Sequence, residues 1–453
     1  MEIPARAGGK GDKREGKKLA WWQLSLLGVG CIIGTGYFLG SGIGLKMTGP
    51  SMLISFILAA IGTYIVAEAL AKMSAQDPQQ GSFRSYAKKA YGPWAGFSSG
   101  WVYWFSEMLI TGSQLTALSI LSRFWFPNVP LWLFASGFAI LGVIVVLIGT
   151  KGFEHTQNIF AVMKVAAIVM FIVIAIGVLF GFFGGNHHDI RIPTNMREFM
   201  PQGMKGLWAS LIFGFYAFGG IEIMGIMAVR LKKKEEAKKA VTIMLMMLTF
   251  IYLLSLILAI VLATHQFNTK ESPFVIALEP YNITFFPHVF NGGIIIAGFS
   301  TMAASLFAVT SMVVTLAEDG DAPKFFSKKG KLKVQPFALC LTILGLIASI
   351  VLSRIMPDRV YEYITTAAGL MLLYNWFFIL ISFPRLIKAT GFGHVKRFAG
   401  MALILLAVSG TLIDKTSRSG FFVSILFVVI VVIVVVIRHF TKKKKKNLYP
   451  QGI

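Results

Sequence analysis

The chain has 453 residues, of which 56% are hydrophobic and only 14% are charged, and its mean hydropathy is +0.71. This composition excludes a soluble globular domain and indicates an all-α polytopic membrane protein. The net charge of +23 would suit a nucleic-acid-binding protein, but the basic residues are spread between and beyond apolar segments. We therefore expect membrane lipids, and not nucleic acid, as the partner of these charges.

Twelve apolar segments predict 12 transmembrane helices, since a helix of about 20 residues crosses a bilayer. The segments lie near residues 24–45, 52–72, 94–121, 130–149, 158–183, 206–229, 240–263, 288–316, 335–355, 361–384, 398–413 and 420–440. No small-residue cleavage site follows a short apolar core near the N-terminus, so we expect no cleaved signal peptide.

The basic residues predict the orientation of these spans. Of the 43 Lys and Arg residues, 32 lie in segments on the same side as the two termini, and 10 lie on the other side. The positive-inside rule then places both termini in the cytoplasm of what we expect to be a bacterial plasma membrane. The lysine run 442–446 is expected to contact water or lipid there. Cys31 and Cys340 fall in predicted spans, which indicates neither a disulfide framework nor a metal site.

Glycines interrupt the first apolar segment. Each one weakens a helix interior by about 1 kcal/mol relative to Ala, and they stand at Gly34, Gly36, Gly40 and Gly42. Backbone unwinds at membrane depth only where it is buried in protein or lines a wet cavity. Unwinding near Gly34 would expose helix ends of opposite partial charge, which suit a small zwitterion. Close packing against a neighbouring helix is the alternative. The spacing does not match G-x-G-x-x-G and lacks a βαβ context, so a dinucleotide-binding loop is excluded.

A carboxylate lies in the third segment, after a stretch at residues 77–93 that we interpret as a loop. Trp104, Glu107, Thr111 and Gln114 share one face of the predicted helix. A charged Glu107 would cost about 2.5–3.5 kcal/mol unless it faced a cavity or a partner. It is therefore a candidate for proton coupling, and a protonated, hydrogen-bonded packing residue is the alternative.

The fifth segment contains Lys164, six residues after its expected start near Asn158 and thus about 9 Å deep. At that depth the side chain could reach the cytoplasmic interface and do nothing more. No acidic residue is near it in the sequence, so burial would favour its neutral form and allow reversible protonation. His187 and His188 precede the sixth segment, and without further ligands at metal-binding spacing we expect a solvated pair.

The sixth segment is interrupted like the first. Gly214, Gly219 and Gly220 interrupt an apolar helix directly before Glu222. Residues 21–185 and 186–390 then form two five-helix units, and the second must enter the membrane inverted because each unit has an odd number of spans. Corresponding glycine-interrupted segments in two such halves point to a transport site at the membrane midplane. Residues 391–440 add two further helices, and residues 1–20 and 441–453 form cytoplasmic tails.

Several motifs in a fixed order carry a family resemblance. They are Ile33-Gly34-Thr35-Gly36-Tyr37-Phe38-Leu39-Gly40-Ser41-Gly42 with Gly49-Pro50, Pro78-Gln79-Gln80-Gly81-Ser82-Phe83 with Tyr86-Ala87, Gly100-Trp101-Val102-Tyr103-Trp104, Phe218-Gly219-Gly220-Ile221-Glu222, Ser272-Pro273-Phe274, and Leu316-Ala317-Glu318-Asp319-Gly320-Asp321-Ala322-Pro323-Lys324. From Trp21 to about Arg385 the chain resembles amino acid permeases of the amino acid–polyamine–organocation superfamily, in their bacterial amino acid transporter branch.

The resemblance implies an inverted five-plus-five helix fold that imports L-amino acids with protons and uses no cofactor. Backbone N–H groups near Thr35 and Gly36 would hold the substrate carboxylate, backbone carbonyls would hold its ammonium, and Tyr216 or Phe218 would act as an aromatic gate. In related permeases a Lys at the place of Lys164 occupies the region where sodium-coupled relatives hold their ion. The expected substrate-binding residues are Ile33, Gly34, Thr35, Gly36, Ser113, Gln114, Phe215, Tyr216, Phe218 and Gly220, and the expected proton-coupling residues are Lys164, Glu222 and Glu107.

The chain departs from the family at positions that bear on substrate choice. Many members carry an acid where this chain has Gln114, and an aromatic residue where it has Glu107. Arg230 replaces an acid after the sixth span, while Ser311 and Phe307 replace an Arg and a Tyr of the eighth. The pocket positions carry few fixed charges, which predicts a neutral, aliphatic or aromatic substrate. An exchanger, or a carrier of cationic amino acids or polyamines, is the alternative.

Two other classes of protein are disfavoured. A polytopic membrane enzyme would need clustered catalytic groups at a membrane face, and the sequence shows no such cluster. A channel would not need broken helices around a midplane site, which suit alternating access better than continuous conduction. We therefore expect no catalytic residues.

Overall fold

The computed structural model describes residues 18–79, 81–182, 192–263, 267–268, 271–281, 283–330, 334–355, 360–388 and 391–448, and for residues 150–156, 158, 360 and 442–448 it describes the backbone alone. The histidine pair 187–188, most of the predicted N-terminal tail and the last five residues of the predicted C-terminal tail lie outside these residues. Within them the secondary structure is helical apart from a single bridge between Leu19 and Leu231.

The helices follow the predicted apolar segments closely. They are α1 (Trp21–Ile32), α2 (Thr35–Phe38), α3 (Gly40–Thr48), α4 (Met52–Gln76), α5 (Ser82–Tyr91), α6 (Pro93–Ser122), α7 (Leu131–Ile148), α8 (Thr150–Leu179), α9 (Met196–Phe199), α10 (Gly203–Tyr216), α11 (Glu222–Ala228), α12 (Ala237–Leu262), α13 (Pro273–Leu278), α14 (Phe285–Glu318), α15 (Pro336–Ile355), α16 (Val360–Leu386), α17 (Gly391–Gly410) and α18 (Lys415–Leu448). Short 3-10 turns lie at Gly49–Ser51, Lys234–Glu236, Glu279–Tyr281 and Lys324–Ser327.

Nine segments of the described chain are helical, long and apolar enough to cross a membrane. The predicted first, third and sixth spans are not among them as single helices, because the first and sixth are broken and the third, α6, is rich in polar residues. The fold is therefore that of a multi-pass helical membrane protein. The count of twelve spans and the inverted repeat stay predictions.

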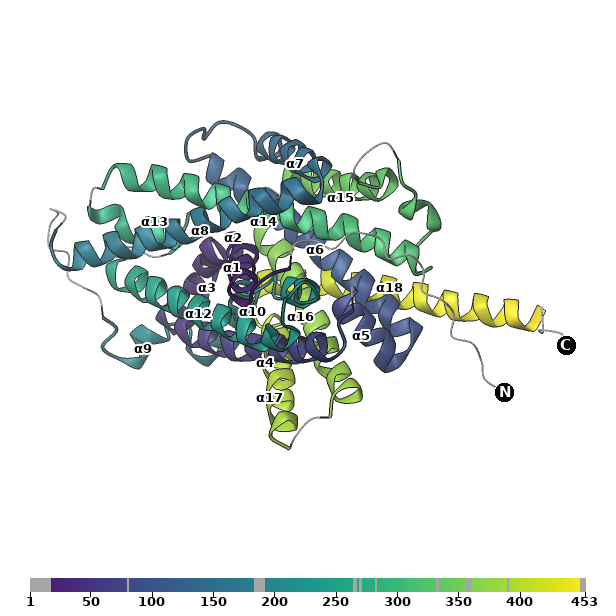
Figure 1. Cartoon of the computed structure of the whole chain (residues 1–453). Coiled ribbons are helices and arrows are strands. Elements are labelled where there is room, and N and C mark those ends of the chain that lie inside the picture. The colour runs from purple at the N-terminus through teal and green to yellow at the C-terminus, as the bar shows by residue number, and fades with distance from the viewer. Residues whose placement is uncertain are drawn as a thin grey trace.

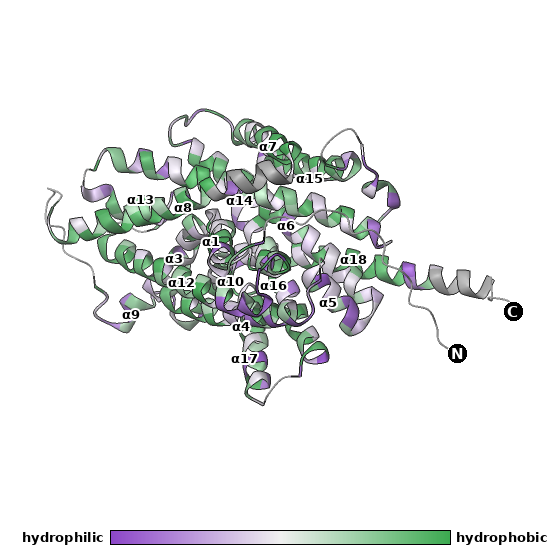
Figure 2. Ribbon diagram, viewed as in Figure 1, coloured by the Kyte–Doolittle hydropathy of each residue, from purple (hydrophilic) through white to green (hydrophobic). Residues whose placement is uncertain are grey.

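Burial separates an inner group of helices from an outer group (Figure 1). In the spanning part of α16, 78% of the residues are buried, against 17% in α17 and in α18. Helix α16 packs against α6, and α6 packs against α14, so these three form much of the interior. The outer helices keep apolar side chains all around, as lipid exposure demands. In Figure 2 the ribbons of α7, α12 and the spanning part of α18 are coloured mostly as hydrophobic.

One expectation from the sequence needs correction. The stretch at residues 77–93 is not simply a loop, since it contains α5, whose buried face is formed by Phe83, Tyr86 and Ala87. This amphipathic spacing is typical of a helix that lies against a protein surface. The apolar part of α8 begins at Ile159, close to the expected start near Asn158, and the helix itself extends back to Thr150, 14 residues before Lys164. Apolarity marks the membrane-spanning part of a helix, and polar residues can extend the helix beyond it.

Candidate functional site

The first helix is broken where its glycines predict. Helix α1 ends at Ile32, Gly34 is extended with φ −158° and ψ −168°, and α2 begins at Thr35. Thr301 of α14 closes the gap, because its hydroxyl donates to the carbonyl of Ile33 at 3.1 Å. A Cβ atom on Gly34 would lie only 2.8 Å from that hydroxyl oxygen. Glycine is therefore required here by the close approach of α14.

Lys164 supports the same break from α8. Its side chain is fully buried, and its ammonium donates to the carbonyl of Gly30 at 2.5 Å and to the hydroxyl of Thr301 at 3.1 Å. The ammonium therefore lies inside the protein and does not reach the membrane interface. It connects the end of α1 to α14, and both of its acceptors are uncharged oxygens.

Helix α6 contacts the other side of the break. The hydroxyl of Thr35 donates to Oε1 of Gln114 at 2.6 Å, and both side chains are buried. The carbonyl of Thr35 accepts a hydrogen bond of 3.1 Å from the hydroxyl of Tyr361, which lies on α16. Polar groups of α6 and α16 thus meet at the start of α2.

Helix α10 brings Tyr216 to the same place. Its hydroxyl shares a 2.6 Å hydrogen bond with that of Ser113. A Cβ atom on Gly36 would lie 2.9 Å from the ring of Tyr216. The structure therefore brings together six of the predicted substrate-binding residues, namely Gly34, Thr35, Gly36, Ser113, Gln114 and Tyr216.

The second break lies in residues 217–221, between α10 and α11. Gly220 has φ 106°, a conformation that favours glycine, and its N–H donates to Oε2 of Glu222 at 3.1 Å. The other carboxylate oxygen of Glu222 accepts a hydrogen bond from the indole N–H of Trp376 on α16. A Cβ atom on Gly220 would lie 3.3 Å from the carbonyl oxygen of Cys31. The second break therefore packs against the last turn of α1, next to the first break.

The two phenylalanines of the predicted site belong to the packing around α10. The ring of Phe218 lies 6.2 Å from that of Phe56 and 5.4 Å from that of Tyr252. The ring of Phe215 lies 6.2 Å from that of Trp376, and the carbonyl of Phe215 accepts the N–H of Phe218 at 3.0 Å. Of the two predicted gate residues, Tyr216 is thus the one that the structure places against the first break.

Glu107 is buried on α6, one helical turn from Tyr103. Its carboxyl faces the side chains of Tyr103 and Ser305. Glu107 also lies close enough to Glu222 for the two carboxylates to repel each other if both are ionised. Two buried acids and one buried ammonium thus surround the two breaks. Within the described residues, no group of three or more His, Cys, Asp or Glu side chains could hold a metal ion.

Thr301, Tyr361 and Trp376 are the residues that sequence reasoning missed. Each donates a hydrogen bond to a broken helix, to Ile33, Thr35 and Glu222 respectively. Each stands in a long apolar segment, where a polar atom needs a partner inside the protein. Their polarity was therefore a usable signal, but it could not identify their partners.

Comparison with known proteins places this architecture in a family. The family model for amino acid permeases matches residues 23–450, so the chain belongs to the amino acid permease family and is a membrane protein of amino acid transport. The chain is 56% identical to the transporter YcgH of Bacillus subtilis over 420 residues, which cover 92% of this chain and 94% of YcgH. It is 31% identical to the aromatic amino acid transport protein AroP of Corynebacterium glutamicum over 449 residues, or 92% and 96% of the two chains. It is 28% identical to the gamma-aminobutyric acid permease of Bacillus subtilis over 369 residues, or 81% and 79%.

Proposed function

We propose that this chain imports a neutral L-amino acid across the plasma membrane together with protons, by alternating access. One observation carries this proposal: the two broken helices meet, with Gly220 against the carbonyl of Cys31 and Gly36 against the ring of Tyr216. Broken helices that meet inside a membrane protein expose backbone polar groups of both signs to a shared ligand. Family membership supports an amino acid as that ligand.

The proposed topology has twelve spans with both termini in the cytoplasm and two inverted five-helix units. The breaks support it, because each lies in the helix that opens one of the two units. The excess of basic residues on one side supports the orientation.

The proposed substrate site uses backbone for the charged ends of the amino acid. Backbone N–H groups near Thr35 and Gly36 take its carboxylate, and carbonyls near Ile33, Phe215 and Phe218 take its ammonium. The side chains beside the breaks, Ser113, Gln114 and Tyr216, are uncharged, which favours a neutral substrate. Relatives named for aromatic amino acids, for threonine and serine, and for gamma-aminobutyric acid agree with a substrate that carries no net charge.

Lys164 is the proposed carrier of the coupled proton. When protonated, it holds the carbonyl of Gly30 and the hydroxyl of Thr301, and so fixes α1 against α14. Loss of the proton removes the charge from both contacts, and charge-assisted hydrogen bonds are about twice as strong as neutral ones. In this proposal the inner gate is the contact of α1 with α8 and α14 through Lys164. It is locked in the protonated form of Lys164 and released in the neutral form. Glu107 and Glu222 are further candidate proton sites, since both are buried carboxyls beside the breaks.

Uptake into proteoliposomes tests this function. Purified protein should accumulate a labelled neutral amino acid above equilibrium when an inward proton gradient is imposed, and a protonophore should abolish the accumulation. Competition by each of the twenty amino acids should favour Leu, Ile, Val or Phe over Lys and Arg. Transport that needs an internal amino acid and ignores the proton gradient would instead show an exchanger, and flux that stops at equilibrium would show a channel.

A further inference from the structure

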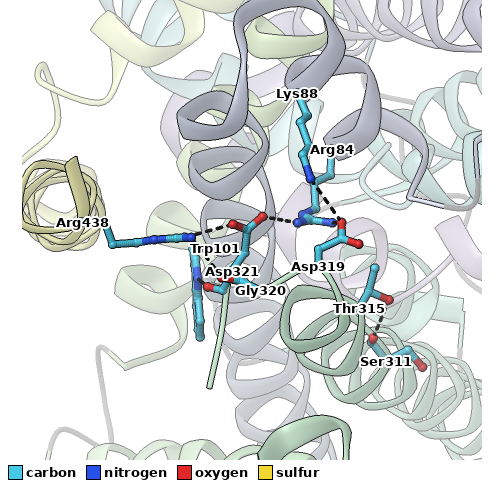
Figure 3. Close-up of polar contacts among 9 residues, drawn as sticks. All are labelled: Arg84, Lys88, Trp101, Ser311, Thr315, Asp319, Gly320, Asp321 and Arg438. Atoms are coloured by element: carbon cyan, nitrogen blue, oxygen red, sulfur yellow. Dashed lines mark hydrogen bonds and ion pairs between the residues drawn. The ribbon is translucent and has the colours of Figure 1, made fainter. Parts of the chain in front are cut away.

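A network of charged residues lies at the end of α14, remote in sequence from both breaks (Figure 3). Arg84 of α5 is almost fully buried and bonds to the carboxylates of Asp319 and Asp321. Arg438 of α18 joins from the other side, donating to the carboxylate of Asp321 and to the carbonyl of Gly320, both at 3.0 Å. Arg438 therefore joins α18 to this buried network.

A crevice of about 380 Å³ lies beside Arg438, between α6 and α18. This volume is within the range of small-molecule sites, about 300–1,000 Å³. Its walls are apolar, and only its end is polar, where Asp321 and Arg438 stand. The apolar lining is formed by Phe97, Trp101, Phe105, Ile430, Val431 and Val434.

Arg438 stands where a membrane-spanning segment ends. The apolar part of α18 runs from Lys415 to Thr441, so Arg438 lies less than one helical turn from its end. A guanidinium has five N–H donors, and the two bonds to the network use two of them. The side chain is 27% exposed, and its guanidinium carbon lies 4.6 Å from the ring centre of Phe97. A fixed cation thus stands at the mouth of an apolar crevice, at the depth of lipid headgroups.

We propose that this crevice binds one anionic phospholipid, whose acyl chain lies along Trp101 and Val434 and whose phosphate binds Arg438. The apolar walls suit a hydrocarbon chain and no charged metabolite, and a guanidinium pairs with phosphate oxygens in its fork geometry. The lysine run 442–446 follows on the same helix and adds to the attraction for negative lipid. Because the crevice is separate from both breaks, this site does not depend on the proposed transport reaction.

Quenching of Trp101 by brominated lipids tests the proposal. The full chain is reconstituted with phosphatidylglycerol or phosphatidylcholine brominated on the acyl chain, and the signal of Trp101 is obtained by difference from a Trp101→Phe variant. We expect half-maximal quenching at an about fivefold lower mole fraction of the anionic lipid, the effect of one basic residue at an anionic surface. Arg438→Gln should abolish this preference. Arg418→Gln removes a charge at the other end of the same helix, where its Nε donates to Leu412, and should leave the preference unchanged.

A second variant keeps the test decisive if Arg438→Gln fails to fold. Val434→Phe narrows the crevice without changing any charge, and it should reduce quenching of Trp101 by both lipids. Equal quenching by the two lipids in the parent protein would overturn the proposal of an anionic lipid site. It would show that Trp101 contacts only the ordinary lipid around the protein. Absence of Trp101 quenching by either lipid would show that no lipid enters the crevice. Neither outcome bears on amino acid uptake, so a failure here is distinct from a failure of the proposed function.

Discussion

The two helix breaks satisfy their unwound backbone in different ways. The first break depends on side chains from other helices, with Thr301 on the carbonyl of Ile33 and Lys164 on that of Gly30. The second combines both means, since the N–H of Gly220 is bound by Glu222 two residues later, while the carbonyl of Ala217 accepts the hydroxyl of Tyr252 on α12 at 3.3 Å. The first break therefore responds to movement of α8 and α14, while at the second break only the N–H of Gly220 carries its acceptor with it.

The charges at the two breaks also differ. A buried ammonium supports the first break and a buried carboxyl supports the second. If the proposed coupling is correct, protonation strengthens the contacts of the first break and removes the negative charge at the second. A ligand that contacts both breaks would then lie near two titrating groups, the ammonium of Lys164 and the carboxyl of Glu222, whose ionised forms have opposite charges. The difference explains why we assign the locking contact to Lys164 and a supporting role to Glu222.

The largest effect is expected where a glycine lets two helices meet. Gly36→Val places atoms against the ring of Tyr216, and Gly220→Ala adds about 1–2 kcal/mol of backbone strain at φ 106°. Both variants should insert in the membrane but lose uptake to the background of empty liposomes. Gly40→Ala is the matched control, because a Cβ atom there meets no atom within 4 Å. If a well-inserted Gly36→Val protein takes up substrate at the rate of the parent, the proposed site is wrong.

Lys164→Ala should separate coupling from binding. The variant loses both contacts of the ammonium at the first break, so we expect loss of accumulation driven by the proton gradient while exchange of labelled for unlabelled substrate continues. Exposed Lys46, on α3, provides a control substitution to Ala that should change neither activity. If Lys164→Ala concentrates substrate like the parent under the same gradient, the lysine is a packing residue and not a proton carrier.

Much of the fold could be predicted because the two strongest sequence signals, the length of apolar segments and the clustering of glycines, are local. Apolar length gave the helix bounds to within a few residues for most spans, and the clustered glycines located both breaks. Helix α5 was missed because it is only ten residues long and amphipathic, so it forms no long apolar segment in the sequence. The start of the apolar part of α8 was predicted near Asn158, but the extension of the helix back to Thr150 was not, because it runs through polar residues.

The partners of the site residues could not be predicted from the sequence. Thr301 and Trp376 lie 268 and 154 positions from the residues they contact, Ile33 and Glu222. Their side chains are polar within apolar spans, which indicates some internal partner but not which one. Contacts of this kind depend on how helices pack, and a single sequence without detectable identity between its two halves does not reveal that packing.

Substitutions of Glu222 and Trp376 are expected to have a smaller effect on uptake. Together they distinguish the role of the carboxyl charge at the second break from the role of its position. Glu222→Gln removes the ionisable group and should change the pH profile of uptake. Trp376→Phe keeps the carboxyl and removes one hydrogen bond, worth about 0.5–1.5 kcal/mol, so uptake should fall by at most about tenfold with an unchanged pH profile. Trp94→Phe, at a half-exposed position, is the control. Identical pH profiles for parent and Glu222→Gln would exclude a proton role for this carboxyl.

The smallest effect is expected from Ser113→Ala, which removes the hydroxyl that holds Tyr216. Loss of one buried hydrogen bond costs about 1 kcal/mol, so the KM for substrate should rise by about fivefold while the maximal rate changes little. Ser119→Ala on the same helix removes a hydroxyl that donates to the carbonyl of Leu115, one helical turn earlier, and should leave KM unchanged. A lower maximal rate with unchanged KM would place Tyr216 in the conformational step and not in the substrate pocket.

A crystal structure of the chain with its substrate bound is the most direct test of the central claim, that the two breaks form one amino acid site. The account predicts the substrate carboxylate at the backbone N–H groups of Thr35 and Gly36, with the ammonium facing carbonyls of the second break and the side chain near Tyr216. Substrate bound elsewhere, with no contact to either break, would contradict it.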